Sequence, residues 1–244
     1  MEKNTLTEIK KGQTGTGLLI EHEGYISSDC GDNKKLFEDI NSKIGTDEPI
    51  CPEHFIVSAV FQKFGIENAN GRIYPEHVLK REVEKYMEKI AGNKFGEKRA
   101  IGECNHPDDT VINLSRVAMN IIELHWVGHT LVGKLEVLTS PGFRKYGIIS
   151  CEGDQIANLL LQGIKIGVSS RGMGTVTNKM GVLYVGDDYE IVCWDFVSEP
   201  STPLAYVSDN EQVIQTYIEG KESKKPQLSE NNKINKALEI LKKF

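Results

Sequence analysis

The sequence of 244 residues lacks long hydrophobic runs and long basic runs. Its uninterrupted apolar stretches, such as 55–57 and 159–161, are far too short to cross a bilayer, and its first residues contain no apolar segment of the signal-peptide kind. The net charge of −6 disfavours a general nucleic-acid-binding protein. We therefore expect neither a membrane nor a nucleic acid as partner, and we expect the protein to stay in a cytoplasm.

Paired cysteines are also lacking, because the five cysteines are odd in number and include no CxxC motif. This pattern disfavours a disulfide framework and a zinc ribbon, so we expect reduced structural thiols and no cofactor. His125 and His129 have HxxxH spacing, but Trp126 stands where a zincin has glutamate, and Gly128 favours a hairpin. We expect no metal, and a metal-dependent hydrolase built on these two histidines and nearby carboxylates remains a competing hypothesis.

Composition divides the chain into three parts. Residues 1–52 are rich in glycine, aspartate and lysine, with one strand-like run at 17–20, and indicate an N-terminal extension that is a candidate pro-segment. Residues 53–208 have the alternating apolar and polar pattern of a folded domain. Residues 209–244 comprise a polar linker and an amphipathic helix with apolar residues at 234, 237, 238, 241 and 244, which either packs back or docks on a partner.

Within residues 53–208, strand patterns outnumber helical ones. Strands are predicted at 55–64, 117–126, 130–138, 164–176, 182–185 and 189–197. Helices are predicted at 75–91, with Leu79, Val83, Met87 and Ile90 on one face, and at 141–163. Because the elements do not alternate as βαβ units, the pattern predicts an α+β fold with a mostly antiparallel sheet or barrel and surrounding helices.

Two glycine-rich polar segments interrupt these strands, at 102–109 (GECNHPDD) and 167–174 (GVSSRGMG). Pro107 favours an extended backbone at His106, which projects its ring from the chain. The glycines of the second segment allow close backbone approach, and its consecutive amides suit an anion or an oxyanion. A serine at such a bend and a histidine elsewhere in the chain are the fewest side chains that nucleophilic acyl transfer requires.

Chain order narrows the class of hydrolase. All six histidines precede Ser169, whereas an α/β-hydrolase needs its histidine after the serine, and Arg171 breaks the G-x-S-x-G pattern. A serine hydrolase here therefore runs histidine first and serine second, with Ser169 or Ser170 as nucleophile. We expect the backbone amides around Ser170, Arg171 and Gly172 to be the oxyanion donors.

Four segments resemble the prohead core proteases of myovirus-type tailed phages, in the same order and at similar spacing: NGRIYP (70–75), GECNHP (102–107), GVSSRGMG (167–174) and WDFVSEPSTP (194–203). The resemblance covers roughly residues 53–208. It implies a fold like that of the herpesvirus assemblins, a barrel-like antiparallel sheet ringed by helices, with His106 and Ser169 as the catalytic pair. It also implies cleavage of scaffold and capsid proteins, commonly after glutamate, inside the assembling prohead in the host cytoplasm, followed by self-cleavage.

The third member of the site is left open by the sequence. Asp195, in the strand after the nucleophile, is the first candidate to orient His106, Glu103 is the second, and a dyad with no acidic partner is the third. The segment Glu219–Gly220 suits self-cleavage after glutamate, although Tyr217 departs from the aliphatic residue expected two positions before the glutamate. The alternative function is a non-catalytic module that binds capsid or scaffold proteins, and self-association is also expected.

Overall fold

The structure is a computed structural model that describes residues 7–26, 31–91, 99–107 and 109–198. Its strands are β1 (Gly15–Ile26), β2 (Phe55–Lys63), β3 (Arg72–Ile73), β4 (Ile101–Glu103), β5 (Val117–Val127), β6 (Thr130–Val137), β7 (Ile166–Lys179), β8 (Val182–Val185) and β9 (Glu190–Val197). Its helices are α1 (Gly31–Lys43), α2 (Glu76–Ile90), α3 (Pro141–Tyr146) and α4 (Glu152–Leu161), with a 3₁₀ turn η1 (Leu114–Arg116).

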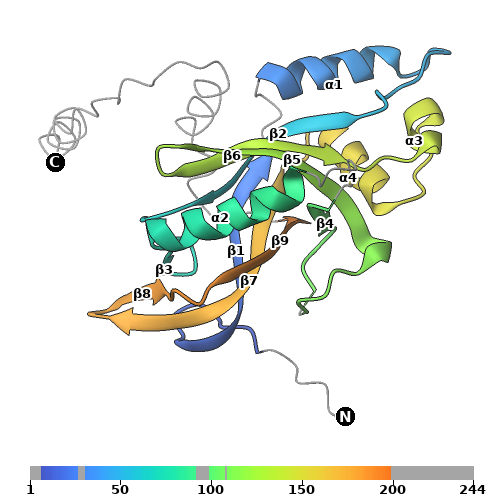
Figure 1. The fold of residues 1–244 in the computed structure, drawn as a ribbon. Helices are drawn as coiled ribbons and strands as arrows, with labels where there is room; N and C mark the ends of the chain where they lie inside the picture. The colour runs from blue at the N-terminus through green and yellow to red at the C-terminus, as the bar shows by residue number, and fades with distance from the viewer. Residues whose placement is uncertain (1–6, 27–30, 92–98, 108, 199–244) are drawn as a thin grey trace, which may run out of the picture.

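The strands form one curved and mostly antiparallel sheet with helices around it (Figure 1). Along its main path the strand order is β3-β8-β7-β1-β2-β6-β5-β4, and β9 pairs with β7 off this path. The short β3–β8 pair is parallel, and the longer ladders between the described strands are antiparallel. This architecture confirms the predicted α+β class.

The end of β4 returns to β9 across the curve of the sheet. Cys104, directly after β4, forms an isolated parallel bridge with Phe196, and the Asn105 amide donates to the Phe196 carbonyl at 2.8 Å. A Cβ atom on Gly102 would lie 1.9 Å from the Trp194 carbonyl oxygen, so only glycine allows this approach. Because the strands meet at one bridge and not along a ladder, the sheet is not a closed barrel, which corrects that part of the prediction.

Helix α2 packs on the sheet beside β9 through one apolar face. Pro75 is its N-cap, directly before Glu76. The Tyr86 ring meets the Trp194 ring edge-on, with 4.8 Å between the centroids. Met87 was predicted on the buried face but is 42% exposed. The face that is buried comprises Val78, Leu79, Glu82, Val83 and Tyr86.

The segment 1–52 is not a separate extension where the structure describes it. β1 lies between β7 and β2, and it is much longer than the strand-like run predicted at 17–20. Helix α1, which the sequence pattern did not predict, is joined to β2 by a side chain: the Asn33 amide donates to the Ser58 carbonyl at 3.0 Å, and Asn33 Oδ1 accepts from the Ser58 amide at 2.7 Å. The domain boundary predicted at residue 52 therefore cuts through one sheet.

The helix predicted at 141–163 is two helices, α3 and α4. Gly147 ends α3 in the left-handed region with φ of 72°, which glycine adopts without strain. Between the helices, the buried carboxylate of Asp154 accepts hydrogen bonds from the amides of Ser140, Ser150 and Cys151 at 2.6, 2.8 and 3.2 Å. The Ser140 and Ser150 hydroxyls also donate to it. One side chain thus holds the link between two helices.

The predicted linker and helix at 209–244, and the segment Glu219–Gly220, lie outside the described residues. No helix among the residues that the structure does describe is long and apolar enough to span a bilayer. His125 and His129 lie on the predicted hairpin of β5 and β6: the first contacts Glu123 at 3.4 Å, and the second faces the Phe64 ring. Over the same residues, no cluster of three or more potential metal-ligating side chains is found.

Candidate active site

Strand β7 places Ser169 and Ser170 on opposite faces of the sheet, because side chains alternate along a strand. Ser169 pairs in register with Asp195 of β9 and lies on the same face as Arg171. Ser170 lies on the other face, toward Tyr189. The two adjacent serines therefore have different surroundings, and Ser169 is the one on the face that carries Arg171 and Asp195.

His106 reaches this face from the segment after β4. The bridge from Cys104 to Phe196 holds the preceding residues on β9, and Asn105 then bends the chain with a positive φ of 64°. The His106 ring lies between the other two residues. Its Nε2 is hydrogen-bonded to Ser169 Oγ, and its Nδ1 lies 2.7 Å from Asp195 Oδ2. The hydroxyl, imidazole and carboxylate form one continuous chain of contacts.

Asp195 and Ser169 have no exposed surface, and the His106 side chain is 8% exposed. Asp195 Oδ1 accepts a hydrogen bond from the Glu103 amide at 2.8 Å, and Oδ2 faces His106. Each carboxylate oxygen is thus committed to a donor, which holds the carboxylate in one orientation. Of the candidates for the third member, Asp195 contacts the imidazole.

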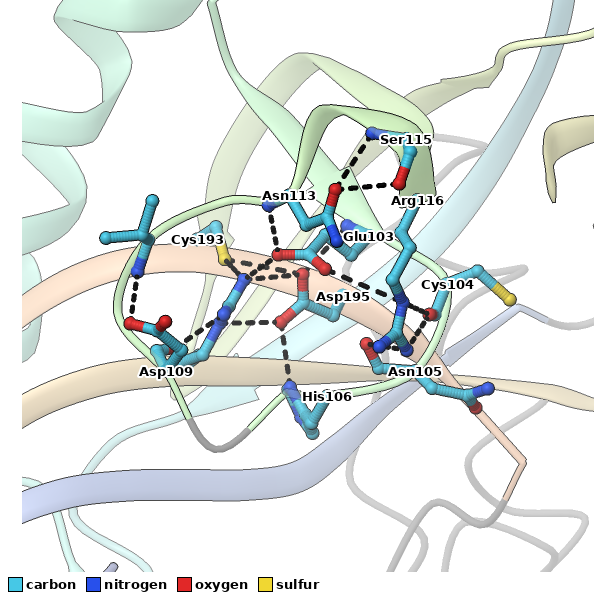
Figure 2. A network of polar contacts seen from close by, with 12 residues as sticks. Glu103, Cys104, Asn105, His106, Asp109, Asn113, Ser115, Arg116, Cys193 and Asp195 are labelled. Carbon is cyan, nitrogen blue, oxygen red and sulfur yellow. Dashed lines mark hydrogen bonds and ion pairs between the residues drawn. The ribbon is translucent and has the colours of Figure 1, made fainter. Parts of the chain in front are cut away.

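Glu103 instead pairs with Arg171. Figure 2 shows Glu103 in the polar network beside Asp195 and His106. Arg171 Nη2 lies 2.9 Å from Glu103 Oε1, and Arg171 Nε lies 3.0 Å from Asp195 Oδ2. The second contact is an ion pair without hydrogen-bond alignment. Burial alone would lower the pKa of the Arg171 guanidinium, but Cys193, Asp195 and the hydrogen bond with Glu103 outweigh it and raise this pKa above its ordinary value. Arg171 therefore stays charged.

Cys193 and Cys104 lie near the network, but they are poor nucleophiles. Burial raises the pKa of the Cys193 thiol well above its ordinary value, and the charge of Asp195 raises it further. Burial likewise raises the pKa of Cys104 to about 11. Because the thiolate is the reactive form, both remain unreactive thiols near neutral pH. The hydroxyl of Ser169 is the group that contacts the imidazole.

The residues predicted to form an oxyanion loop, 170–172, lie within β7. Ser170, Arg171 and Gly172 pair with β1 on one side and with β9 on the other. Backbone amides of a strand between two neighbours serve the ladders, and they do not form an open anion-binding loop. The glycine at 172 serves packing instead, since a Cβ there would lie 2.5 Å from the Tyr189 ring.

Three residues of the network were not singled out from the sequence: Cys193, Asp109 and Asn113. Arg171 Nη1 donates to the Asp109 carbonyl at 2.6 Å, and the Asn113 amide donates to Glu103 Oε1 at 3.0 Å. One signal was available, because an arginine inside an apolar β-run implies a buried acidic partner. The identity of that partner requires the fold.

The NGRIYP segment forms a second buried network, away from His106. Arg72 Nη1 lies 2.6 Å from Glu21 Oε1, and the Tyr74 hydroxyl donates to the same oxygen at 2.9 Å. Asn68 and Asn70 donate to Glu21 Oε2. This network anchors the segment 68–74 to β1, so the role of the motif here is structural.

Comparison with known proteins agrees with this fold. The profile of the family described as prohead core protein serine protease matches residues 18–217. The prohead core protein protease of Enterobacteria phage T4 is 29% identical over 174 residues, which cover 70% of this chain and 76% of that protein. The solved structure of the bacteriophage T4 capsid assembly protease matches with a TM-score of 0.55 and 23% identity, over 75% of this chain and 98% of that chain.

The fold is thus that of a phage capsid assembly protease. The family profile covers most of the sequence, including most of β1 and both segments that supply the site. The chain belongs to the prohead core protein serine protease family.

Proposed function

We propose that the protein is a serine endopeptidase in which Ser169 is the nucleophile, His106 the general base and Asp195 the residue that orients the imidazole. The observation that carries the proposal is the unbroken chain of contacts from Ser169 Oγ through both ring nitrogens to Asp195 Oδ2. The proposal is also supported by the register of the sheet, in which Ser169 and Asp195 are partners on neighbouring strands.

The geometry supports one assignment of protons. With the Nδ1 proton donated to Asp195, the lone pair of Nε2 faces the Ser169 hydroxyl. Ser169 Oγ attacks the scissile carbonyl while Nε2 takes its proton, and the imidazolium then protonates the leaving amine. Water repeats the sequence to release the acyl group. Because Ser169 has no exposed surface here, a peptide reaches its hydroxyl only when neighbouring segments move.

The proposed substrates are scaffold and capsid proteins of the prohead, cleaved after glutamate, together with the protease itself. The family description and the names of the two T4 relatives support this role. The proposed place of action is the assembling prohead within the host cytoplasm. The segment Glu219–Gly220 is the proposed site of self-cleavage.

The test is co-expression of the chain with its scaffold protein, with cleavage followed by mass spectrometry. We expect Ser169→Ala and His106→Ala to abolish cleavage, with a loss of at least ~10⁴-fold in kcat. The matched control is Ser170→Ala, which removes the neighbouring hydroxyl on the other face and should retain cleavage. Cleavage that survives Ser169→Ala would refute the serine mechanism.

Two further outcomes point elsewhere. Sensitivity of the wild-type protein to a chelator would favour a metal-dependent hydrolase. Absence of cleavage by the wild type, with binding to the scaffold retained, would favour the non-catalytic module.

A further inference from the structure

Three charged side chains without exposed surface lie together beside His106: Glu103 of β4, Arg171 of β7 and Asp195 of β9. With both carboxylates ionised, two negative charges face one positive charge. A buried carboxylate is costly to desolvate unless a cation lies beside it, and the Arg171 guanidinium lies 3.0 Å from Asp195 Oδ2. The net charge of the group is then −1, and it faces the imidazole.

The same ion pair also holds the segment that carries His106. Arg171 Nη1 donates to the Asp109 carbonyl at 2.6 Å, three residues after His106. Glu103 Oε1 accepts from the Asn113 amide at 3.0 Å, and the Glu103 amide donates to Asp195 at 2.8 Å. The ion pair of Glu103 and Arg171 therefore contacts both the strand that carries Asp195 and the segment that carries His106.

We propose that Glu103 and Arg171 are positioning residues, a buried ion pair that places a cation beside Asp195, keeps this carboxylate aimed at His106 and fixes residues 104–107 and 109–113 against β7 and β9. This inference rests on the proposed function, in which Asp195 orients the base. Neither residue touches the reacting atoms: both act through Asp195 and the loop.

Charge balance gives the pair a measurable effect on the pH profile. When His106 accepts the serine proton, the imidazolium neutralises the net −1 of the three buried side chains. The other groups around the ring belong to different elements. Arg116 of η1 lies 3.8 Å from Glu103 Oε2, Cys193 of β9 is a neutral thiol, and the Asp109 carboxylate accepts from the Val111 amide.

The variant Glu103→Gln separates charge from shape. Its amide oxygen still accepts from Arg171 and from the Asn113 amide, but one negative charge near the ring is gone. The imidazolium is then less favoured, so the acid limb of the kcat/KM profile should move to lower pH by about 0.5–1 unit. The plateau of kcat should fall by about 3- to 10-fold, because the base is weaker.

The variant Arg171→Lys tests the geometry with the charge kept. One ammonium cannot reach Glu103, Asp195 and the Asp109 carbonyl together as the fork of the guanidinium does. We expect a fall in kcat of about 10-fold or more, because the base is misplaced, with an acid limb within about 0.3 unit of the wild type.

The matched control is Glu21→Gln, in the other buried ion pair. Glu21 and Arg72 are similarly buried and somewhat closer, at 2.6 Å against 2.9 Å, but they belong to the network around NGRIYP and not to the one that holds His106 and Asp195. This variant should lower the melting temperature and leave the acid limb where it is in the wild type.

The experiment measures kcat/KM against pH with a fluorogenic peptide of residues 214–223 (IQTYIEGKES), and the ring titration of His106 by NMR in a Ser169→Ala background. Both should show the shift in Glu103→Gln and not in Glu21→Gln. Coincident profiles for wild type and Glu103→Gln would overturn the inference, as would unchanged kcat in Arg171→Lys if Glu103→Gln does not fold.

Failure of the proposed function gives a different result. Cleavage by Ser169→Ala would reject the serine mechanism, whatever the Glu103 variants do. The ring titration requires no activity, so it tests the effect of Glu103 on His106 even if the wild type does not cleave.

Discussion

At the scale of single residues, Asp195 is the side chain whose two oxygens have separate tasks. One accepts from the Glu103 amide, and the other faces His106 Nδ1. An asparagine retains the first contact but presents an NH₂ group to the ring or forces the opposite tautomer. We predict that Asp195→Asn lowers kcat by about 10²- to 10⁴-fold with little change in KM. Steady-state kinetics would measure this, with circular dichroism to verify the fold. Wild-type kcat in this variant would favour the dyad.

Asp154 illustrates a residue whose role is stability. Burial alone would raise its pKa, but hydrogen bonds from Ser140 and Ser150 outweigh it and hold this pKa below its ordinary value of 3.8. A lowered pKa in the folded state means that the carboxylate stabilises the fold above pH 3.8, and that this stabilisation is lost as the pH falls below it.

We therefore predict that Asp154→Asn lowers the free energy of unfolding by about 2–3 kcal/mol at pH 7, because amide donors then face an NH₂ group. The difference from wild type should shrink near pH 3. Urea unfolding at the two pH values would measure it. Asp188→Asn, at an exposed turn with two hydrogen bonds from Thr175, is the control and should show a smaller loss. Equal losses at both pH values would contradict the linkage.

Sequence reasoning reached His106, Ser169 and Asp195 because each lies in a recognisable segment, and the structure brings the three together. It did not reach the partners of Arg171. Glu103 lies 68 residues earlier in the chain and meets Arg171 only because β4 curves back to β9. Contacts of this kind depend on strand order, which alternation of apolar residues does not specify.

At the scale of elements, the approach of β4 to β9 determines the position of His106. Gly102 is the point of closest contact, with no room for a Cβ beside the Trp194 carbonyl. We predict that Gly102→Ala separates the two strands, misplaces the imidazole and lowers kcat by about 10²-fold or more, with a loss of about 2–4 kcal/mol in stability. Kinetics and thermal unfolding would measure both.

The control for this prediction is Gly163→Ala, in the turn after α4, where a Cβ meets nothing within 4 Å. Its φ of 77° makes alanine strained there, so stability should fall, but the site should keep its geometry and its kcat. If Gly102→Ala and Gly163→Ala lowered kcat equally, the loss in Gly102→Ala would come from lower stability of the whole fold and not from a misplaced imidazole.

Strands with plain alternation or long apolar runs were predictable, as β2, β5 and β6 show. Helix α1 was not, because its sequence is dominated by charged and polar residues and its buried contacts include the side chain of Asn33. The break between α3 and α4 was also missed. It depends on Gly147 and on the hydrogen bonds of Asp154, and neither interrupts the apolar pattern strongly.

At the scale of the whole molecule, β1 is the strand that joins β7 to β2. We predict that a chain beginning at residue 27 fails to fold, because removing β1 leaves unpaired edges on both neighbours and removes Glu21, the register partner of Ser170. Circular dichroism and limited proteolysis would measure this against the full chain. A folded, active product would instead support a removable pro-segment of residues 1–52.

The pairing of β1 with β7 also has a consequence for synthesis. Glu21 and its partner Ser170 are separated by most of the chain, and Asp195 follows later still. At a translation rate of ~5–20 residues per second, the ribosome needs about 10–35 s after β1 emerges to deliver β9. Until β7 emerges, β1 lacks its partner on one side, and until β9 emerges the three residues of the proposed site cannot meet. We therefore expect a nascent chain on the polysome to lack an assembled site.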